Sequence, residues 1–124
     1  MSVQTGQKTF NFALKASVAD APKVEEAIKV HAQWMREHHS YDDSKIKLLH
    51  FYVSKAEELN NPIDPSQGTT GNVLYSINEV YAHPEGIGQH MEKAKVWDYF
   101  GSFLEVLGQF GQVVIVAGDV VETL

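Results

Sequence analysis

The chain has 124 residues, a formal net charge of −6 and no cysteine. A chain of this length forms one domain, here residues 1–124, whose core needs no disulfide or metal ion to stabilise it. The absence of cysteine excludes disulfides, thiolate metal sites and cysteine nucleophiles, and the ten basic residues are scattered among acidic ones, which argues against a nucleic-acid partner.

The N-terminal residues, MSVQTGQKTF, lack the apolar stretch of a signal peptide. Nowhere do about 18 apolar residues follow one another, as a membrane-spanning helix would require. We therefore expect a cytoplasmic protein with no membrane partner.

The first two predicted elements are a strand and an amphipathic helix. Apolar residues alternate with mostly polar ones at Phe10, Phe12, Leu14, Ala16 and Val18, which predicts a strand with one apolar face. Asp20 can then cap a helix, and Pro22 suits its first turn. Side chains at spacings of three and four share one face of this helix: Val24, Ala27, Ile28, His31, Trp34, Met35 and His38.

Two further strands are predicted on either side of a loop. Residues 46–53 (IKLLHFYV) and 73–82 (VLYSINEVYA) have the composition of strands. Residues 60–72 between them are rich in Asn, Pro, Asp, Ser and Gly, which predicts a long loop.

A second helical region begins near Pro84 and carries one stripe of inward residues with a kink near residues 95–97. The stripe consists of Ile87, His90, Met91, Ala94, Trp97, Phe100 and Leu104. Gly108 and Gly111 close this region, and the valine-rich residues 113–121 form the last strand.

The order strand, helix, strand, strand, helix, strand predicts an α+β, ferredoxin-like βαββαβ fold, in which two helices cover one face of a four-stranded antiparallel sheet. We expect the other face to be apolar as well, because it would carry His50, Tyr52, Tyr75, Ile77 and the valines of the last strand. A second copy of the chain is the simplest cover for that face, since most soluble oligomers are symmetric.

The segment NEVYAHPEGIGQHMEKAKVWDYF, residues 78–100, resembles the antibiotic-biosynthesis-monooxygenase-like (ABM-like) family of dimeric α/β-barrel proteins. In that family a strand ending in glutamate-x-tyrosine leads into a helix that carries a histidine followed by an apolar residue. Glu79, Tyr81, His90 and Met91 occupy those places here. The resemblance implies a homodimer whose two sheets pair into a barrel, with a pocket between each sheet and its own helices.

The chain departs from the family pattern at two places. Family members often have a second histidine followed by phenylalanine, where this chain has Lys95 and Val96. Haem-degrading relatives need an axial histidine at a place near Phe100, so we expect no haem.

Potential metal ligands cluster only at His38, His39, Asp42 and Asp43, without the spacing of a known metal motif. The sequence therefore predicts neither a metal site nor another cofactor.

His90 is the candidate catalytic residue, because a neutral imidazole on an apolar stripe can orient or deprotonate a phenol or enol. A structural histidine hydrogen-bonded to the backbone would have the same pattern. The candidate pocket-lining residues are His31, Trp34, His38, Tyr81, Trp97 and Phe100. Aromatic stripes of this kind also occur in ordinary cores.

Relatives in the ABM-like family are described as oxidising aromatic polyphenols or quinols with molecular oxygen and no cofactor. The resemblance therefore implies a cofactor-independent monooxygenase-like enzyme, an oxidoreductase, that acts on a small aromatic or quinone-type molecule. Two alternatives remain open. The same fold also hosts isomerases and decarboxylases, and it could equally serve a non-catalytic dimer that binds a small ligand or responds to stress.

Overall fold

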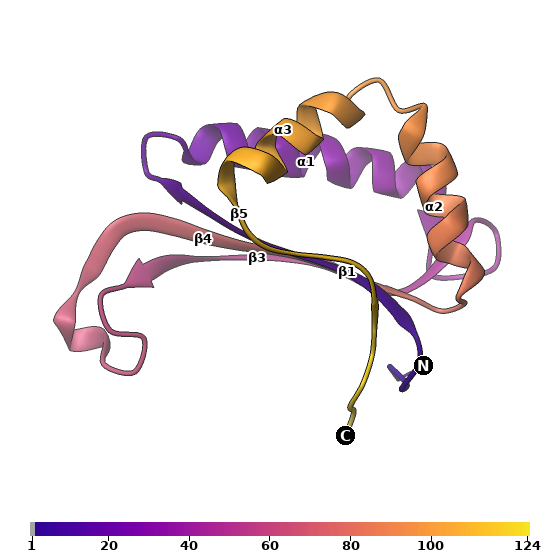
Figure 1. Cartoon of the computed structure of the whole chain (residues 1–124), viewed down its shortest axis with the longest axis horizontal. Coiled ribbons are helices and arrows are strands. Elements are labelled where there is room, and N and C mark those ends of the chain that lie inside the picture. The colour runs from indigo at the N-terminus through magenta and orange to yellow at the C-terminus, as the bar shows by residue number, and fades with distance from the viewer. Residues whose placement is uncertain (1) are drawn as a thin grey trace.

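The computed structural model describes residues 2–124 and has two layers, a five-stranded sheet and three helices that cover one of its faces (Figure 1). The strands are β1 (Lys8–Ser17), β2 (His39–Ser40), β3 (Ile46–Leu59), β4 (Thr69–Tyr81) and β5 (Gly111–Asp119). The helices are α1 (Ala21–His38), α2 (Glu85–Lys95) and α3 (Phe100–Phe110), with a short 3₁₀ helix at Pro65–Gln67.

The sheet has the strand order β2-β3-β4-β1-β5. Its four long strands pair antiparallel, which confirms the ferredoxin-like βαββαβ topology. The prediction of four strands is wrong by one, because His39 and Ser40 pair in parallel with Ile46 and Lys47 at the sheet edge. This short strand forms where the backbone becomes extended at His39, directly after α1.

The hairpin of β3 and β4 is longer than predicted and projects beyond the helices (Figure 1). The predicted loop over 60–72 shortens to residues 60–68, and the second predicted strand continues past Val53 to the end of β3. Polar contacts stabilise this extension, since Glu58 of β3 binds three side chains of β4 and β1. These are Lys15, Thr70 and Asn72. A segment held by such polar contacts shows no alternation of apolar and polar residues, so the sequence pattern does not indicate that the strands continue.

The helical region after β4 is two helices rather than one kinked helix, because residues 96–99 are not helical. The break changes which residues face inward. Phe103 is buried, whereas Leu104, which the stripe placed inside, is 48% exposed. Within residues 2–124, no helix has both the length and the apolar character needed to cross a membrane.

The core lies between the helices and the sheet. It contains the alternating residues of β1, but Val18 lies beyond the strand and is exposed. Tyr75 and Ile77 were predicted on the uncovered face, and that prediction is wrong. They pair opposite Leu14 and Phe12, so they face the helices and are buried.

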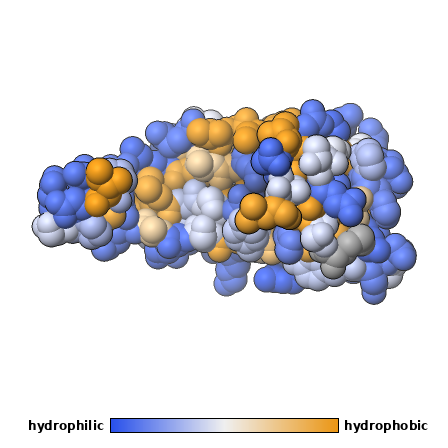
Figure 2. All heavy atoms as spheres, turned by 90° about the horizontal axis from the view of Figure 1, so that it is seen from below, coloured by the Kyte–Doolittle hydropathy of each residue, from blue (hydrophilic) through white to orange (hydrophobic). Residues whose placement is uncertain are grey.

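The uncovered face of the sheet, which we call the open face, is of mixed polarity (Figure 2). A chain of hydrogen-bonded side chains runs through its centre: Asn11, Asn78, Ser76 and Ser54. Hydrophobic residues gather along one edge in Figure 2, and β5 exposes four aliphatic side chains in a row at residues 113–116. The face is therefore apolar at this edge and less apolar at its centre than the sequence predicts.

Candidate functional site

Five titratable side chains lie together inside the core, between the sheet and the helices. This buried cluster consists of His31, His39, Glu79, Tyr81 and His90. Glu79 and Tyr81 share the inner face of β4 because they are two residues apart in a strand. His31 and His90 lie on the inner stripes of α1 and α2, and His39 enters from β2.

His39 fixes the direction of the hydrogen bonds in the cluster. Its Nδ1 lies 3.1 Å from the carbonyl oxygen of Met35, which can only accept, so Nδ1 carries a hydrogen. In neutral His39 the lone pair is then on Nε2, which lies 3.0 Å from Nδ1 of His90. Two lone pairs would repel at this distance, and Nδ1 of His90 therefore carries a hydrogen and donates to His39.

Tyr81 completes the arrangement around His90. Its hydroxyl donates to Oε1 of Glu79 at 2.7 Å and lies 2.7 Å from Nδ1 of His90. The N–H of His90 is thus shared between the Tyr81 oxygen and Nε2 of His39. A neutral His90 in this tautomer keeps its lone pair on Nε2, as a general base requires.

Glu79 and His31 are less well matched. Nε2 of His31 lies 3.6 Å from Oε2 of Glu79, which is too long for a hydrogen bond. Within the described residues, neither Oε2 of Glu79 nor Nδ1 of His31 has a hydrogen-bond partner. Each unsatisfied buried polar atom costs about 1–3 kcal/mol. This end of the cluster is therefore where a further polar group would be stabilised most.

Burial keeps the cluster uncharged, because charged groups are poorly stabilised away from water. It raises the pKa of Glu79 to about 8 and lowers the pKa of His31 and His90 to about 3 and that of His39 to about 4. Burial also raises the pKa of Tyr81 far above its ordinary value. Near neutral pH, Glu79 is therefore a protonated acid and the three imidazoles are neutral.

Aromatic rings enclose the histidines of the cluster. Phe103 stacks on His31 with 4.5 Å between ring centroids. Trp34 meets His90 edge-on at 5.0 Å and stacks on Trp97 at 5.0 Å with an interplanar angle of 22°. Trp34 therefore stands between His90 and Trp97.

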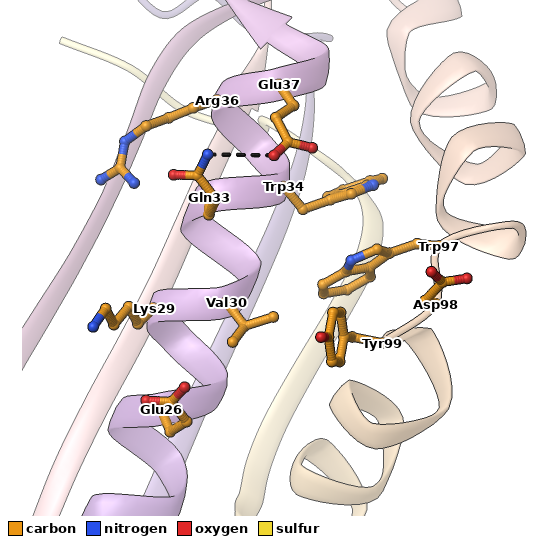
Figure 3. Close-up of a pocket in the computed structure, with 10 residues that line it drawn as sticks. All are labelled: Glu26, Lys29, Val30, Gln33, Trp34, Arg36, Glu37, Trp97, Asp98 and Tyr99. Atoms are coloured by element: carbon orange, nitrogen blue, oxygen red, sulfur yellow. Dashed lines mark hydrogen bonds between the residues drawn. The ribbon is translucent and has the colours of Figure 1, made fainter.

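An open groove of about 520 Å³ lies on the outer side of these rings, between α1 and the link of residues 96–99 (Figure 3). Trp34, Trp97 and Tyr99 line it on one side, and the side chains of Lys29 and Arg36 point away from these rings. A neighbouring pocket of about 260 Å³ shares Trp97 and Tyr99 with the groove. Together they offer aromatic surface to a flat ligand.

The predicted site residues occupy three different positions. Trp34 and Trp97 line the groove, whereas His31, Tyr81 and His90 belong to the buried cluster. His38 and Phe100 are half-buried, and the ring of His38 lies 5.3 Å from that of Trp34. None of the five cavities described on residues 2–124 is lined by His31, Tyr81, His90, His38 or Phe100.

The predicted set of site residues left out two members of the cluster, Glu79 and His39. Glu79 could have been found, because the alternation of β4 places it beside Tyr81. His39 gives no such signal, since helical spacing favours its neighbour His38. Within residues 2–124, no group of three or more His, Asp or Glu side chains is arranged to hold a metal ion.

Comparisons with known proteins give one similar structure. No protein-family model matches the chain, and no curated protein matches it. A solved structure described as "Putative antibiotic biosynthesis monooxygenase from Nitrosomonas europaea" aligns over 95% of both chains, with 14% sequence identity and a TM-score of 0.47. A likeness this distant carries no argument about activity, and the ferredoxin-like fold rests on the strand order and pairing described above.

Proposed function

We propose that this protein is an ABM-like, cofactor-independent monooxygenase that acts on a small aromatic or quinone-type molecule. The observation that supports this most is the tautomer of His90. Its Nδ1–H is held by Tyr81 and His39, so that Nε2 keeps the lone pair in an aromatic surrounding. A base whose second nitrogen is held by other side chains is the usual arrangement for proton abstraction.

In the proposed reaction His90 removes the hydroxyl proton of a phenol or enol. The resulting anion transfers an electron to oxygen. The organic radical and superoxide then combine at a conjugated ring carbon that bears one hydrogen, and the peroxide formed there takes back the proton from His90. Loss of water then leaves a carbonyl there, with one oxygen atom in the product and the other in water. The protein contributes the base, the orientation and the exclusion of water.

We propose that the substrate enters through the groove between α1 and residues 96–99. Trp97 is half-buried on a non-helical link, and the ring of Trp34 alone separates it from His90. Movement of these two rings would open a path from the groove toward His90. Acidic and basic side chains both line the groove, which favours a substrate of low net charge.

The test is oxygen consumption by the purified protein with a panel of polycyclic hydroquinones. We expect the wild type to consume oxygen and His90→Gln to lose about 10²–10⁴-fold in rate, the usual contribution of a general base. His83→Gln is the matched control, because His83 is exposed and lies outside the cluster, and we expect it to keep its activity. Full activity of His90→Gln would contradict the proposed role, and turnover without oxygen would favour an isomerase or decarboxylase.

A second candidate is a non-catalytic dimer that binds a small ligand in the groove. It is favoured by the filled core, because Phe10 and Trp34 pack directly against His90. Titration of the same hydroquinones, followed by tryptophan fluorescence, separates the two candidates. A binding protein should saturate without consuming oxygen, and His90→Gln should bind as tightly as the wild type.

We also propose a homodimer that forms through the open face. Val113 and Ile115 pair opposite Ala13 and Asn11, so they face that side, and β5 is an unpaired edge of the sheet. A hollow of about 530 Å³ crosses the open face near Ala13 and Leu74. An exposed aliphatic edge strand is a surface that soluble proteins usually cover, and a second copy is its simplest partner.

A further inference from the structure

We propose that His39 receives the proton that His90 removes from the substrate, so that the positive charge rests on His39 during the reaction. The inference depends on the proposed role of His90 as a base. His39 does not reach the groove, and it acts through His90. It is therefore a positioning residue rather than a catalytic one.

The geometry suits a transfer between the two imidazoles. Nε2 of His39 lies 3.0 Å from Nδ1 of His90, and Nδ1 of His39 is held by the carbonyl of Met35. The backbone of His39 is held as well, because its N–H also donates to Met35 and β2 pairs with β3. Both rings are therefore fixed in the arrangement that the transfer requires.

The transfer balances without a further reactant. The substrate O–H bond breaks as an N–H bond forms at Nε2 of His90. The Nδ1–H bond of His90 breaks as an N–H bond forms at Nε2 of His39. The result is a substrate anion, a neutral His90 that can donate its new Nε2–H to that anion, and a His39 imidazolium. No electron moves in this step.

His39 is better placed than His90 to carry the charge. It follows the last residue of α1, where the helix dipole presents its negative end, and the Met35 carbonyl accepts one of its hydrogens. That hydrogen bond raises the pKa of His39 and opposes the effect of burial, whereas the pKa of His90 is lowered by burial and by the other histidines. The titratable and charged groups around His39 are His31, His38, Arg36, Tyr41, Tyr81, His90 and Lys93.

Among these groups, His38 and Lys93 lower the pKa of His39. Glu79 is linked to it only through Tyr81 and is protonated near neutral pH. His39 also borders a surface pocket of about 80 Å³ with Ser40 and Tyr41. A positive charge on His39 would thus lie nearer to water than a positive charge on His31.

The hydrogen-bond directions can be tested by NMR on the ¹⁵N-labelled protein at pH 7. We expect His39 and His90 both to carry their hydrogen on Nδ1, and we expect a scalar coupling across the hydrogen bond between Nδ1 of His90 and Nε2 of His39. An Nε2–H tautomer in either residue would overturn the proposal. This measurement needs no substrate and holds whether or not the protein proves to be an enzyme.

The role in turnover is tested with His39→Gln. The glutamine amide can donate to Met35 and accept from His90, but it cannot take up a proton. We expect the His90 tautomer and the KM to stay unchanged while kcat falls about tenfold to a hundredfold, within the range of acid–base effects. His83→Gln, at an exposed site outside the cluster, is the control and should keep its kcat.

Three outcomes separate this inference from the proposed function. If His39→Gln keeps its full kcat while His90→Gln is inactive, the role of His39 is wrong and the enzyme proposal stands. If His39→Gln loses kcat and also changes the His90 tautomer, its role is structural and the inference fails. If the wild type consumes no oxygen with any hydroquinone, the proposed function fails, and the inference fails with it.

Discussion

At the scale of single residues, the buried cluster determines how stability depends on pH. The folded state keeps the Glu79 proton up to about pH 8, whereas the unfolded chain loses it near pH 4.5, so Glu79 reduces stability as the pH rises through that window. The three buried histidines act in the opposite direction. The unfolded chain protonates them below pH 6.5, whereas the folded state does not until about pH 3–4. Where the two pH ranges overlap, the stability gained from the three histidines as the pH rises exceeds the stability lost at Glu79. We therefore expect maximum stability near pH 6.5.

Glu79→Gln should remove the alkaline loss of stability. The amide oxygen can still accept from Tyr81, and the NH₂ group takes the place of Oε2 beside Nε2 of His31. We expect this variant to exceed the wild type in free energy of unfolding by several kcal/mol at pH 9 and to differ little at pH 5. Urea denaturation at both pH values measures the difference.

Glu25→Gln is the matched control, because Glu25 is an exposed carboxylate whose pKa is lowered by its hydrogen bond from Tyr75. It should show no gain at pH 9. Parallel pH curves for Glu79→Gln and the wild type would mean that Glu79 is already ionised in the folded protein near neutral pH.

Tyr81→Phe should destabilise the fold by about 1–3 kcal/mol, because it leaves Oε1 of Glu79 buried without a donor. Tyr75→Phe removes a hydroxyl that also donates to a carboxylate, but that carboxylate is exposed and can bond to water. We expect the second change to cost clearly less. Equal losses in urea denaturation would show that the hydroxyl of Tyr81 is not what satisfies Glu79.

At this scale the sequence predicts His90 and Tyr81, leaves out Glu79 although it lies on the same strand as Tyr81, and misses His39, which follows the end of a helix. His90 was predicted on the inward stripe of its helix and Tyr81 among the pocket-lining residues, and both are buried. His39 takes its place because the chain leaves the helix at that residue and turns its side chain inward. Periodicity cannot place a side chain beyond the last turn of a helix.

At the scale of elements, Gly86 determines how closely α2 packs on β4. A Cβ at this position would lie 2.9 Å from Cδ1 of Tyr81 and 3.5 Å from Cγ2 of Ile46. We expect Gly86→Ala to shift the start of α2 and to cost about 1–3 kcal/mol, as overpacked cores do. The same shift should weaken the contact between Tyr81 and His90, which the histidine NMR spectrum would report.

Gly88→Ala, two residues further along the same helix, is the control. A Cβ there meets no atom within 4 Å among the described residues, and alanine favours a helix by roughly 0.5–1 kcal/mol. This variant should be as stable as the wild type or slightly more stable. If both alanine variants behave alike in urea denaturation, the packing of Gly86 does not limit the position of α2.

The elements that the sequence misplaced have one thing in common. Their bounds depend on contacts between residues that are distant in the chain. The sequence predicts a kink near residues 95–97, but residues 96–99 contain neither proline nor glycine to signal a complete break between α2 and α3. The break allows Trp97 to stack on Trp34 while Phe103 stacks on His31. Tertiary packing here outweighs the local preference to continue a helix.

At the scale of the whole molecule, the order of elements was enough to predict the fold but not which face of the sheet each strand residue occupies. Alternation in β4 is compatible with either face for Tyr75 and Ile77. Their position follows from the register with β1, where Phe12 and Leu14 already face the helices. The open face consequently holds Ser76 and Asn78, and its apolar area lies mainly along β5.

The proposed dimer can be tested at that edge with Ile115→Lys. Ile115 pairs opposite Asn11 and faces the open side, so a partner sheet would bury the new ammonium group without a counter-charge. We expect sedimentation velocity to show a dimer for the wild type and a folded monomer for this variant. Val18→Lys makes a similar aliphatic-to-lysine change at a site outside the sheet that is 65% exposed, and it should remain a dimer. If the wild type sediments as a monomer at micromolar concentration, or Ile115→Lys remains a dimer, the open face is not the interface.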